Sequence, residues 1–181
     1  MPAQGTEQAS TPRTDHATAR LVAAGESPLR SVGQVPWHEF KDSIGSAEGI
    51  PLLLDAIAWG DPDAARTALA QLRERICQYG FVVQQATAAV VPFLWELARS
   101  PRVTCRAQII DLLSSIAAAR QWEDTAAVYP KLLNHRENPV VWERQAREAV
   151  QSRRGLIRHL AVGESPEIAR ATQELARALG E

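Results

Sequence analysis

Proline residues that directly follow a helix-capping side chain recur along this chain at steps of roughly 40 residues. Three such pairs share that spacing and a fourth follows sooner: Asp61-Pro62, Ser100-Pro101, Asn138-Pro139 and Ser165-Pro166. The side-chain oxygen of Asp, Ser or Asn accepts hydrogen bonds from the first turn of a helix, and proline is favoured at the first helical position. Each pair therefore predicts the start of a helix.

A second set of prolines divides the same stretches into pairs of helices. Pro51, Pro92 and Pro130 each follow an apolar residue and precede a leucine-containing segment. Apolar residues recur at spacings of three and four throughout, which is typical of helices with one buried face, and no stretch alternates as a strand does. We expect helix pairs at about 46–80, 81–120 and 121–163, closed by a capping helix at 164–180.

A repeat of about 40 residues built from two helices is typical of helical solenoids. The order of Pro, Leu-Leu and a polar-Pro turn resembles HEAT repeats over about residues 46–180. The resemblance implies an all-α fold, a short right-handed α-solenoid of HEAT-like helix pairs. It also implies that the second helix of each pair lines a concave face.

The start of the chain differs from the rest in composition. Residues 1–33 are rich in Ser, Thr, Pro, Gly and small polar residues. Such a segment buries too little apolar surface to offset the entropy of ordering it, so we expect a mostly disordered tail. The folded domain should span 34–181, with Val35, Trp37 and Phe40 covering its first apolar end.

A narrower likeness rests on Gly45-Ser46-Ala47-Glu48, Ile50-Pro51 and ATAAVVPFLWEL at 86–97. These segments are similar to a group of small bacterial, actinobacterial-type HEAT-like proteins, some of which look like immunity partners of toxins. In this chain Gln78-Tyr79-Gly80 stands where that group has a His-Gln-Gly turn, and Ile44 replaces an aromatic residue. The resemblance implies an adaptor or immunity-type protein.

Charge and apolar content limit the classes of partner. The 181 residues have a net charge of −1, which disfavours non-specific attraction to nucleic acid or anionic membranes. No window reaches the 18 or so apolar residues of a membrane span, and the N-terminus lacks the pattern of a secretory signal. Cys77 and Cys105 lie in helical patterns without metal-ligand spacing, as expected of buried cysteines in a reducing compartment. A cytoplasmic location is the expectation.

Motifs that would indicate catalysis are absent from the sequence. Its four histidines are scattered, and none pairs with Cys, Asp or Glu at a metal-ligand or catalytic spacing. We therefore expect no enzyme activity, no cofactor and no metal.

Basic residues gather on the predicted second helices, whereas the predicted first helices carry more acidic than basic residues. The resemblance then implies a basic concave surface and an acidic back. Helical phasing places arginines outside the buried stripes, and Trp142 should be exposed because Val140 and Val141 can fill the buried positions. The candidate binding residues are Arg66, Arg73, Arg106, Trp142 and Arg147. The alternative is that these arginines form ordinary ion pairs on solvated helix faces.

Three functions remain open. The leading hypothesis is a helical-repeat adaptor or immunity-type protein that binds a protein partner, either an acidic surface or a peptide, in an Arg-rich groove. The second is a HEAT-like nucleic-acid-binding protein or DNA glycosylase, with Asp111 and Trp142 facing the lesion. The third is a self-associating scaffold.

Overall fold

The computed structural model describes residues 29–132, 136–160 and 165–180. Seven α-helices lie in these ranges: α2 (Ile50–Trp59), α3 (Pro62–Ile76), α4 (Thr87–Arg99), α5 (Arg106–Ala118), α6 (Gln121–Val128), α7 (Pro139–Gln151) and α8 (Pro166–Ala178). The all-α class is thereby confirmed.

Short elements connect the helices. The 3-10 helices are η1 (Val32–Gln34), η2 (Trp37–Glu39), η3 (Ala47–Gly49), η4 (Pro130–Leu132) and η5 (Arg154–His159). Strand β1 (Lys41–Asp42) pairs with β2 (Gly45–Ser46), and β3 (Cys77–Gln78) pairs with β4 (Val82–Val83), both antiparallel. Each pair of two-residue strands forms a tight hairpin. Strands this short do not show as an alternation of apolar and polar residues in the sequence.

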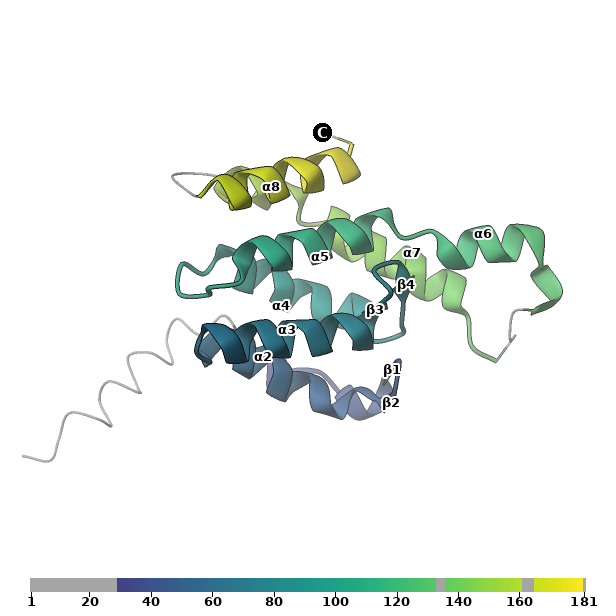
Figure 1. Cartoon of the computed structure of the whole chain (residues 1–181). Coiled ribbons are helices and arrows are strands. Elements are labelled where there is room, and N and C mark those ends of the chain that lie inside the picture. The colour runs from purple at the N-terminus through teal and green to yellow at the C-terminus, as the bar shows by residue number, and fades with distance from the viewer. Residues whose placement is uncertain (1–28, 133–135, 161–164, 181) are drawn as a thin grey trace, which may run out of the picture.

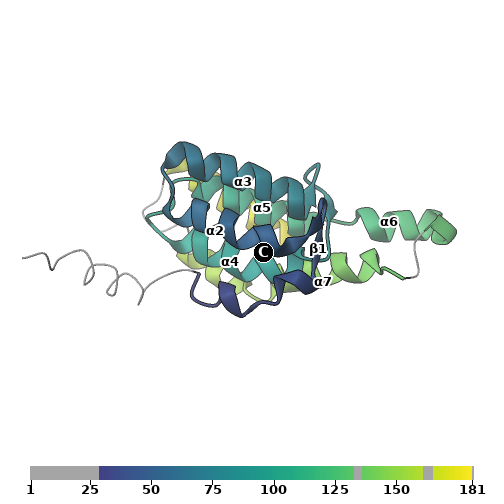
Figure 2. The same ribbon diagram turned by 90° about the horizontal axis from the view of Figure 1, so that it is seen from below.

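The helices form two layers, with α3, α5 and α8 in front and α2, α4 and α7 behind (Figures 1 and 2). Within the body α2 packs on α3 and α4 on α5, α7 packs against both α4 and α5, and α8 packs along α5. The core lies between the layers. Its fully buried side chains include Leu54, Leu72, Trp95, Ile110 and Leu113.

The predicted third unit differs from the observed packing. Its first helix, α6, has no buried residue and extends beyond the body in both views (Figures 1 and 2). The place on α4 is taken by α7, and the place on α5 by α8. Helix α8 packs on the body because it has an apolar stripe in which Ile168 and Leu175 are buried. Helix α6 has no buried residue.

At the N-terminal end, the predicted lid packs on the core. Trp37 is buried, its ring lies 6.1 Å from that of Phe93, and its indole N–H donates to the carbonyl of Val32. Val35 and Phe40 are partly buried against the same core. Leu29 is buried as well, so ordered packing begins before residue 34; residues 1–28 of the predicted tail lie outside the described residues.

Candidate binding groove

Three adjoining hollows border helix α3, and together we call them the groove. The central hollow, of about 260 Å³, lies between α3 and α5 and is lined by Arg66, Leu69, Ala70, Arg73, Gln108 and Leu112. The C-terminal hollow, of about 490 Å³, is lined by Arg73, Gly80, Phe81, Asp111, Ser114, Ser115, Ala118, Ala119, Arg170 and Glu174. The N-terminal hollow, of about 610 Å³, is lined by Ser43, Ile44, Gly49, Leu52, Leu53, Ala70, Gln71, Glu74 and Arg75.

The three hollows adjoin one another, because neighbouring hollows share a lining residue. Ala70 lines both the N-terminal and the central hollow, and Arg73 lines both the central and the C-terminal hollow. The N-terminal hollow is rimmed by Ile44 and Leu52, which are 71% and 74% exposed. The groove therefore runs from an apolar end to a charged end.

Most arginines of the groove already have acidic partners. Arg66 pairs with Asp63 one turn earlier in α3. The Nη1 atom of Arg170 lies 2.9 Å from Oε1 of Glu174, and its Nη2 atom lies 3.4 Å from Oδ2 of Asp111. The groove is consequently close to electroneutral along much of its length.

Arg73 is different, because it makes no ion pair with any residue that the structure describes. It is half-buried in the last turn of α3. Its guanidinium lies so close to Gly80 that a Cβ atom there would stand 3.1 Å from Nη2. A cation without a carboxylate partner thus sits where two hollows meet.

The β3–β4 hairpin forms one rim of the C-terminal hollow. At its tip Tyr79 has a φ of 55° and Gly80 a φ of 82°. The N–H of Gly80 donates to the carbonyl of Cys77, and that of Phe81 to the carbonyl of Gln78. The rings of Tyr79 and Phe81 lie 6.2 Å apart, and Tyr79 is 71% exposed.

Of the predicted site residues, Arg66, Arg73 and Asp111 line the groove. The prediction for Arg106 was wrong, because this residue is only 6% exposed and its Nε donates to the carbonyl of Ala98 over 2.7 Å. The guanidinium ties the start of α5 to the end of α4, so it does not face a ligand.

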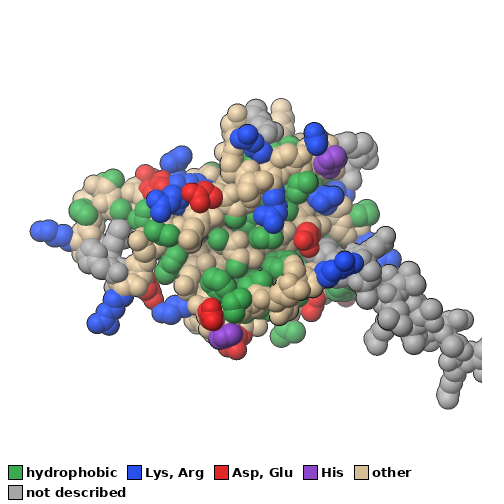
Figure 3. Space-filling view, turned by 180° about the vertical axis from the view of Figure 1, so that it is seen from behind, with side chains coloured by type: hydrophobic (Ala, Val, Ile, Leu, Met, Phe, Trp, Pro, Cys, Tyr) green, Lys and Arg blue, Asp and Glu red, His purple; other side chains and the backbone are tan. Residues whose placement is uncertain are grey.

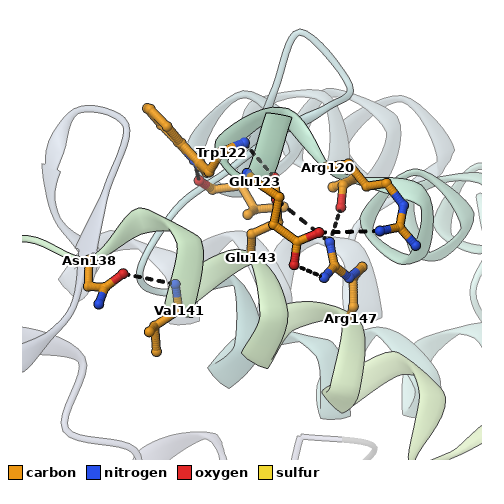
Figure 4. A network of polar contacts seen from close by, with 9 residues as sticks. Arg120, Trp122, Glu123, Asn138, Val141, Glu143 and Arg147 are labelled. Carbon is orange, nitrogen blue, oxygen red and sulfur yellow. Dashed lines mark hydrogen bonds and ion pairs between the residues drawn. The ribbon is translucent and has the colours of Figure 1, made fainter. Parts of the chain in front are cut away.

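The prediction for Arg147 was wrong for a similar reason (Figure 4). Its side chain is only 18% exposed, and Nη1 donates to the carbonyl of Ala119 over 2.8 Å. Nη2 bonds to Oε1 of Glu123, and Nη1 lies 3.6 Å from Oε1 of Glu143. Trp142, on the same helix, was predicted to be exposed. It is half-buried instead, in the rear layer of helices.

Glu143 is a residue that the sequence analysis missed. It is fully buried in α7, and its two carboxylate oxygens accept the backbone N–H groups of Trp122 and Glu123, each over 3.0 Å (Figure 4). It therefore caps the N-terminus of α6 from another helix. The hydrogen bond from Arg147 lowers the pKa of Glu123 below its ordinary 4.5. No local pattern signals this role, because the capped helix lies about 20 residues upstream.

The opposite face of the molecule is mixed in charge. Figure 3 shows hydrophobic side chains gathered over its middle, with Lys and Arg as well as Asp and Glu around them. The predicted acidic back was therefore wrong. Arginines such as Arg144, Arg153 and Arg154 belong to α7 and the segment after it, which do not stack in the front layer.

Metal binding and thiol reactivity depend on the His, Cys, Asp and Glu side chains of the described residues. No group of three or more His, Cys, Asp or Glu side chains there could hold a metal ion. Both cysteines are buried and free, and burial raises the pKa of Cys77 to about 11, which keeps its thiol protonated at neutral pH. Two of the four histidines, His16 and His135, lie outside the described residues.

Comparison with known proteins adds no assignment. The chain matches no protein-family model, and no curated protein or solved structure is significantly similar to it. None of the described helices is both long and apolar enough to cross a membrane.

Proposed function

We propose that this chain is a helical-repeat adaptor, a short right-handed solenoid of HEAT-like helix pairs that binds a segment of another protein in the groove. The observation that carries the proposal is the series of three adjoining hollows along α3, which share Ala70 and Arg73. Concave sites with apolar floors and a few convergent polar groups are the usual form of binding sites. The two stacked layers of helices support the solenoid arrangement.

The charge arrangement favours a protein over a nucleic acid as the partner. Binding to a phosphate backbone draws on several unopposed cations. In the groove Arg66, Arg75 and Arg170 are paired with carboxylates, which leaves Arg73 as the unopposed cation among the described lining residues. For the glycosylase alternative, Asp111 lines the groove whereas Trp142 lies in the other layer, so the two do not share a cleft.

An immunity-type role is the concrete form of this function, in which the bound protein is a toxin that the groove blocks. The self-associating scaffold differs only in that the bound segment comes from a second copy of the chain. Both possibilities use the same surface, so one experiment on that surface separates them.

The test places a benzophenone-bearing amino acid at Gln108, which is exposed and lines the central hollow. The control protein carries it at Arg154, which is exposed on η5, away from the groove. After irradiation in the cells that make the protein, we expect crosslinked adducts from position 108 and not from position 154. Mass spectrometry identifies the adduct.

Adducts that form equally from both positions, or from position 154 alone, would contradict the groove as the binding surface. An adduct composed of two copies of this chain would replace the adaptor with the scaffold.

A further inference from the structure

Arg73 stands at the middle of the groove with its charge unopposed. It lines two of the three hollows, and the neighbouring arginines Arg66 and Arg170 are already paired. A planar guanidinium forms two parallel hydrogen bonds with a carboxylate, and such a bond is strong where water is partly excluded. The complementary group on a ligand at this point is therefore a carboxylate.

Tyr79 directly precedes Gly80, against which Arg73 lies, and its backbone is strained. A bulky side chain at positive φ is an outlier, because Cβ crowds the following carbonyl, and glycine or asparagine avoids most of the cost. Here the strained residue is a large aromatic that is 71% exposed and is supported only by the ring of Phe81 among the described ring contacts. Strain of this kind is found at functional sites. Exposed tyrosines at such sites are common anchors of protein interfaces.

The geometry of the hairpin joins these two features. Gly80 follows Tyr79 directly, and the guanidinium of Arg73 lies against it, with room for no more than a hydrogen at that position without a shift. The floor of the central hollow beside Arg73 is apolar, formed by Leu69 and Leu112, which are 5% and 1% exposed. Arg73 and the ring of Phe81 therefore line the C-terminal hollow, with Tyr79 against that ring at the hairpin tip, and the apolar floor adjoins them in the central hollow.

We infer that the groove binds an acidic linear segment of a partner protein, whose carboxylate pairs with Arg73 while a neighbouring apolar side chain packs on Tyr79 and Phe81. This inference rests on the proposed function and names its ligand. The bound segment continues past Ala70 toward the N-terminal hollow. There its apolar side chains pack on the exposed side chains of Ile44 and Leu52.

The test uses the full chain as bait for random short peptides displayed on phage. We expect wild-type protein to enrich peptides with Asp or Glu beside an apolar residue. Synthetic copies of the enriched peptides should bind Arg73→Glu at least about tenfold more weakly by fluorescence anisotropy. Arg73→Lys, which keeps the charge and loses the fork, should bind with intermediate affinity. Arg154→Glu makes the same charge change on η5 and should bind as wild type does.

Tyr79→Asn provides a readout that a structural role would not give. Asparagine tolerates positive φ, so this variant should unfold at a higher urea concentration than wild type and yet bind the peptides about tenfold more weakly. A merely structural tyrosine would change both properties in the same direction. Weaker binding together with lower stability would therefore overturn the role of Tyr79.

Failure of this inference is distinct from failure of the proposed function. If enriched peptides lack acidic residues, or bind Arg73→Glu as tightly as wild type, the acidic segment is excluded. In that case crosslinks from position 108 still report a protein in the groove. If those crosslinks are missing as well, the proposed function fails with it.

Discussion

At the scale of single residues, Gly80 carries two separate constraints. Its φ of 82° lies in the left-handed region, and a Cβ atom there would meet the guanidinium of Arg73. Gly80→Ala should therefore lower the free energy of unfolding by about 1–2 kcal/mol, measured by urea denaturation. Gly155→Ala is the matched control, because nothing lies within 4 Å of a Cβ there and its φ is not positive. Equal effects of the two substitutions would rule out strain at the hairpin tip.

Glu143 is the residue on which the attachment of α6 depends. Glutamine keeps its shape but offers one acceptor oxygen in place of two and loses the charge that faces Arg147. Glu143→Gln should lower the free energy of unfolding by about 2 kcal/mol, because hydrogen bonds to charged groups are the stronger kind. Amide hydrogen exchange in α6 should rise most. Glu148→Gln, exposed on the same helix, should leave both properties unchanged.

Two carboxyl groups give opposite responses to pH. The pKa of Glu123 is lowered by its hydrogen bond from Arg147, so its ionised form stabilises the fold at neutral pH, and this contribution is lost as pH falls from 4.5 through the lowered value. Burial raises the pKa of Glu96 above 4.5, against the opposing charges of Arg153 and Arg99, so its ionisation opposes folding at neutral pH.

The matched pair of variants tests these signs. Glu123→Gln should be less stable than wild type at pH 7, and this difference should shrink in acid. Glu96→Gln should be more stable than wild type at pH 7, and its advantage should shrink in acid as wild-type Glu96 takes up its proton. Urea denaturation at pH 7 and near pH 3.5 measures both, and a shared sign at pH 7 would show that one assignment is wrong.

At the scale of elements, the sequence predicted three of four helix starts. Asp61, Asn138 and Ser165 each cap a helix whose first residue is proline. Ser100-Pro101 instead forms a turn, in which the N–H of Val103 donates to the carbonyl of Ser100, and α5 begins at Arg106. Proline is favoured both at the first helical position and at the second position of a turn, so the dipeptide alone does not distinguish the two.

The cap of α3 offers a direct test at this scale. The carboxylate of Asp61 accepts hydrogen bonds from the N–H groups of Asp63 and Ala64, over 3.0 and 2.8 Å. Asp61→Ala should lower the free energy of unfolding by about 1 kcal/mol in urea denaturation. The control is Asp55→Ala on the exposed side of α2, which should have no effect beyond a few tenths of a kcal/mol. A similar loss in both variants would mean that the cap contributes nothing specific.

The third helix pair could not be predicted from local pattern. Pro130 follows an apolar residue as Pro51 and Pro92 do, but the three prolines are not equivalent in the structure: Pro51 lies in the first turn of α2, Pro92 inside α4, and Pro130 after the end of α6. Which helix stacks on α4 is decided by the long-range burial of α7 and α8, and no spacing of prolines encodes it.

At the scale of the whole molecule, the same long-range packing explains which site residues could be predicted. Assigning residues outside a single buried stripe to the exposed face works for α3, which has one buried and one exposed face. It places Arg66 and Arg73 in the groove, as the structure does. It fails for α5, which is covered by α4, α7 and α8, so that Arg106 is buried along with the apolar residues of that helix. It fails for α7 because that helix joins the rear layer and is held by Glu143 and Arg147.

The packing order also predicts how the molecule unfolds. Helix α5 packs mainly on α4, α7 and α8, whereas α3 packs mainly on α2 and borders α5 at the central hollow. If the helix pairs form the proposed solenoid, stability is the sum of contributions from each pair and its neighbours. Leu72→Ala in α3 and Leu113→Ala in α5 each empty a fully buried site, and each should cost about 2–5 kcal/mol.

The two variants should differ in where the loss is felt. Hydrogen exchange of Leu72→Ala should rise in α2 and α3 and stay near wild-type values in α8, because the end pair can open while α4, α5, α7 and α8 remain packed. Leu113→Ala removes a contact from the helix that the others share, so exchange should rise in all of them together. If Leu72→Ala raised exchange in α8 as much as in α2, the body would be a single cooperative unit and not a stack of helix pairs.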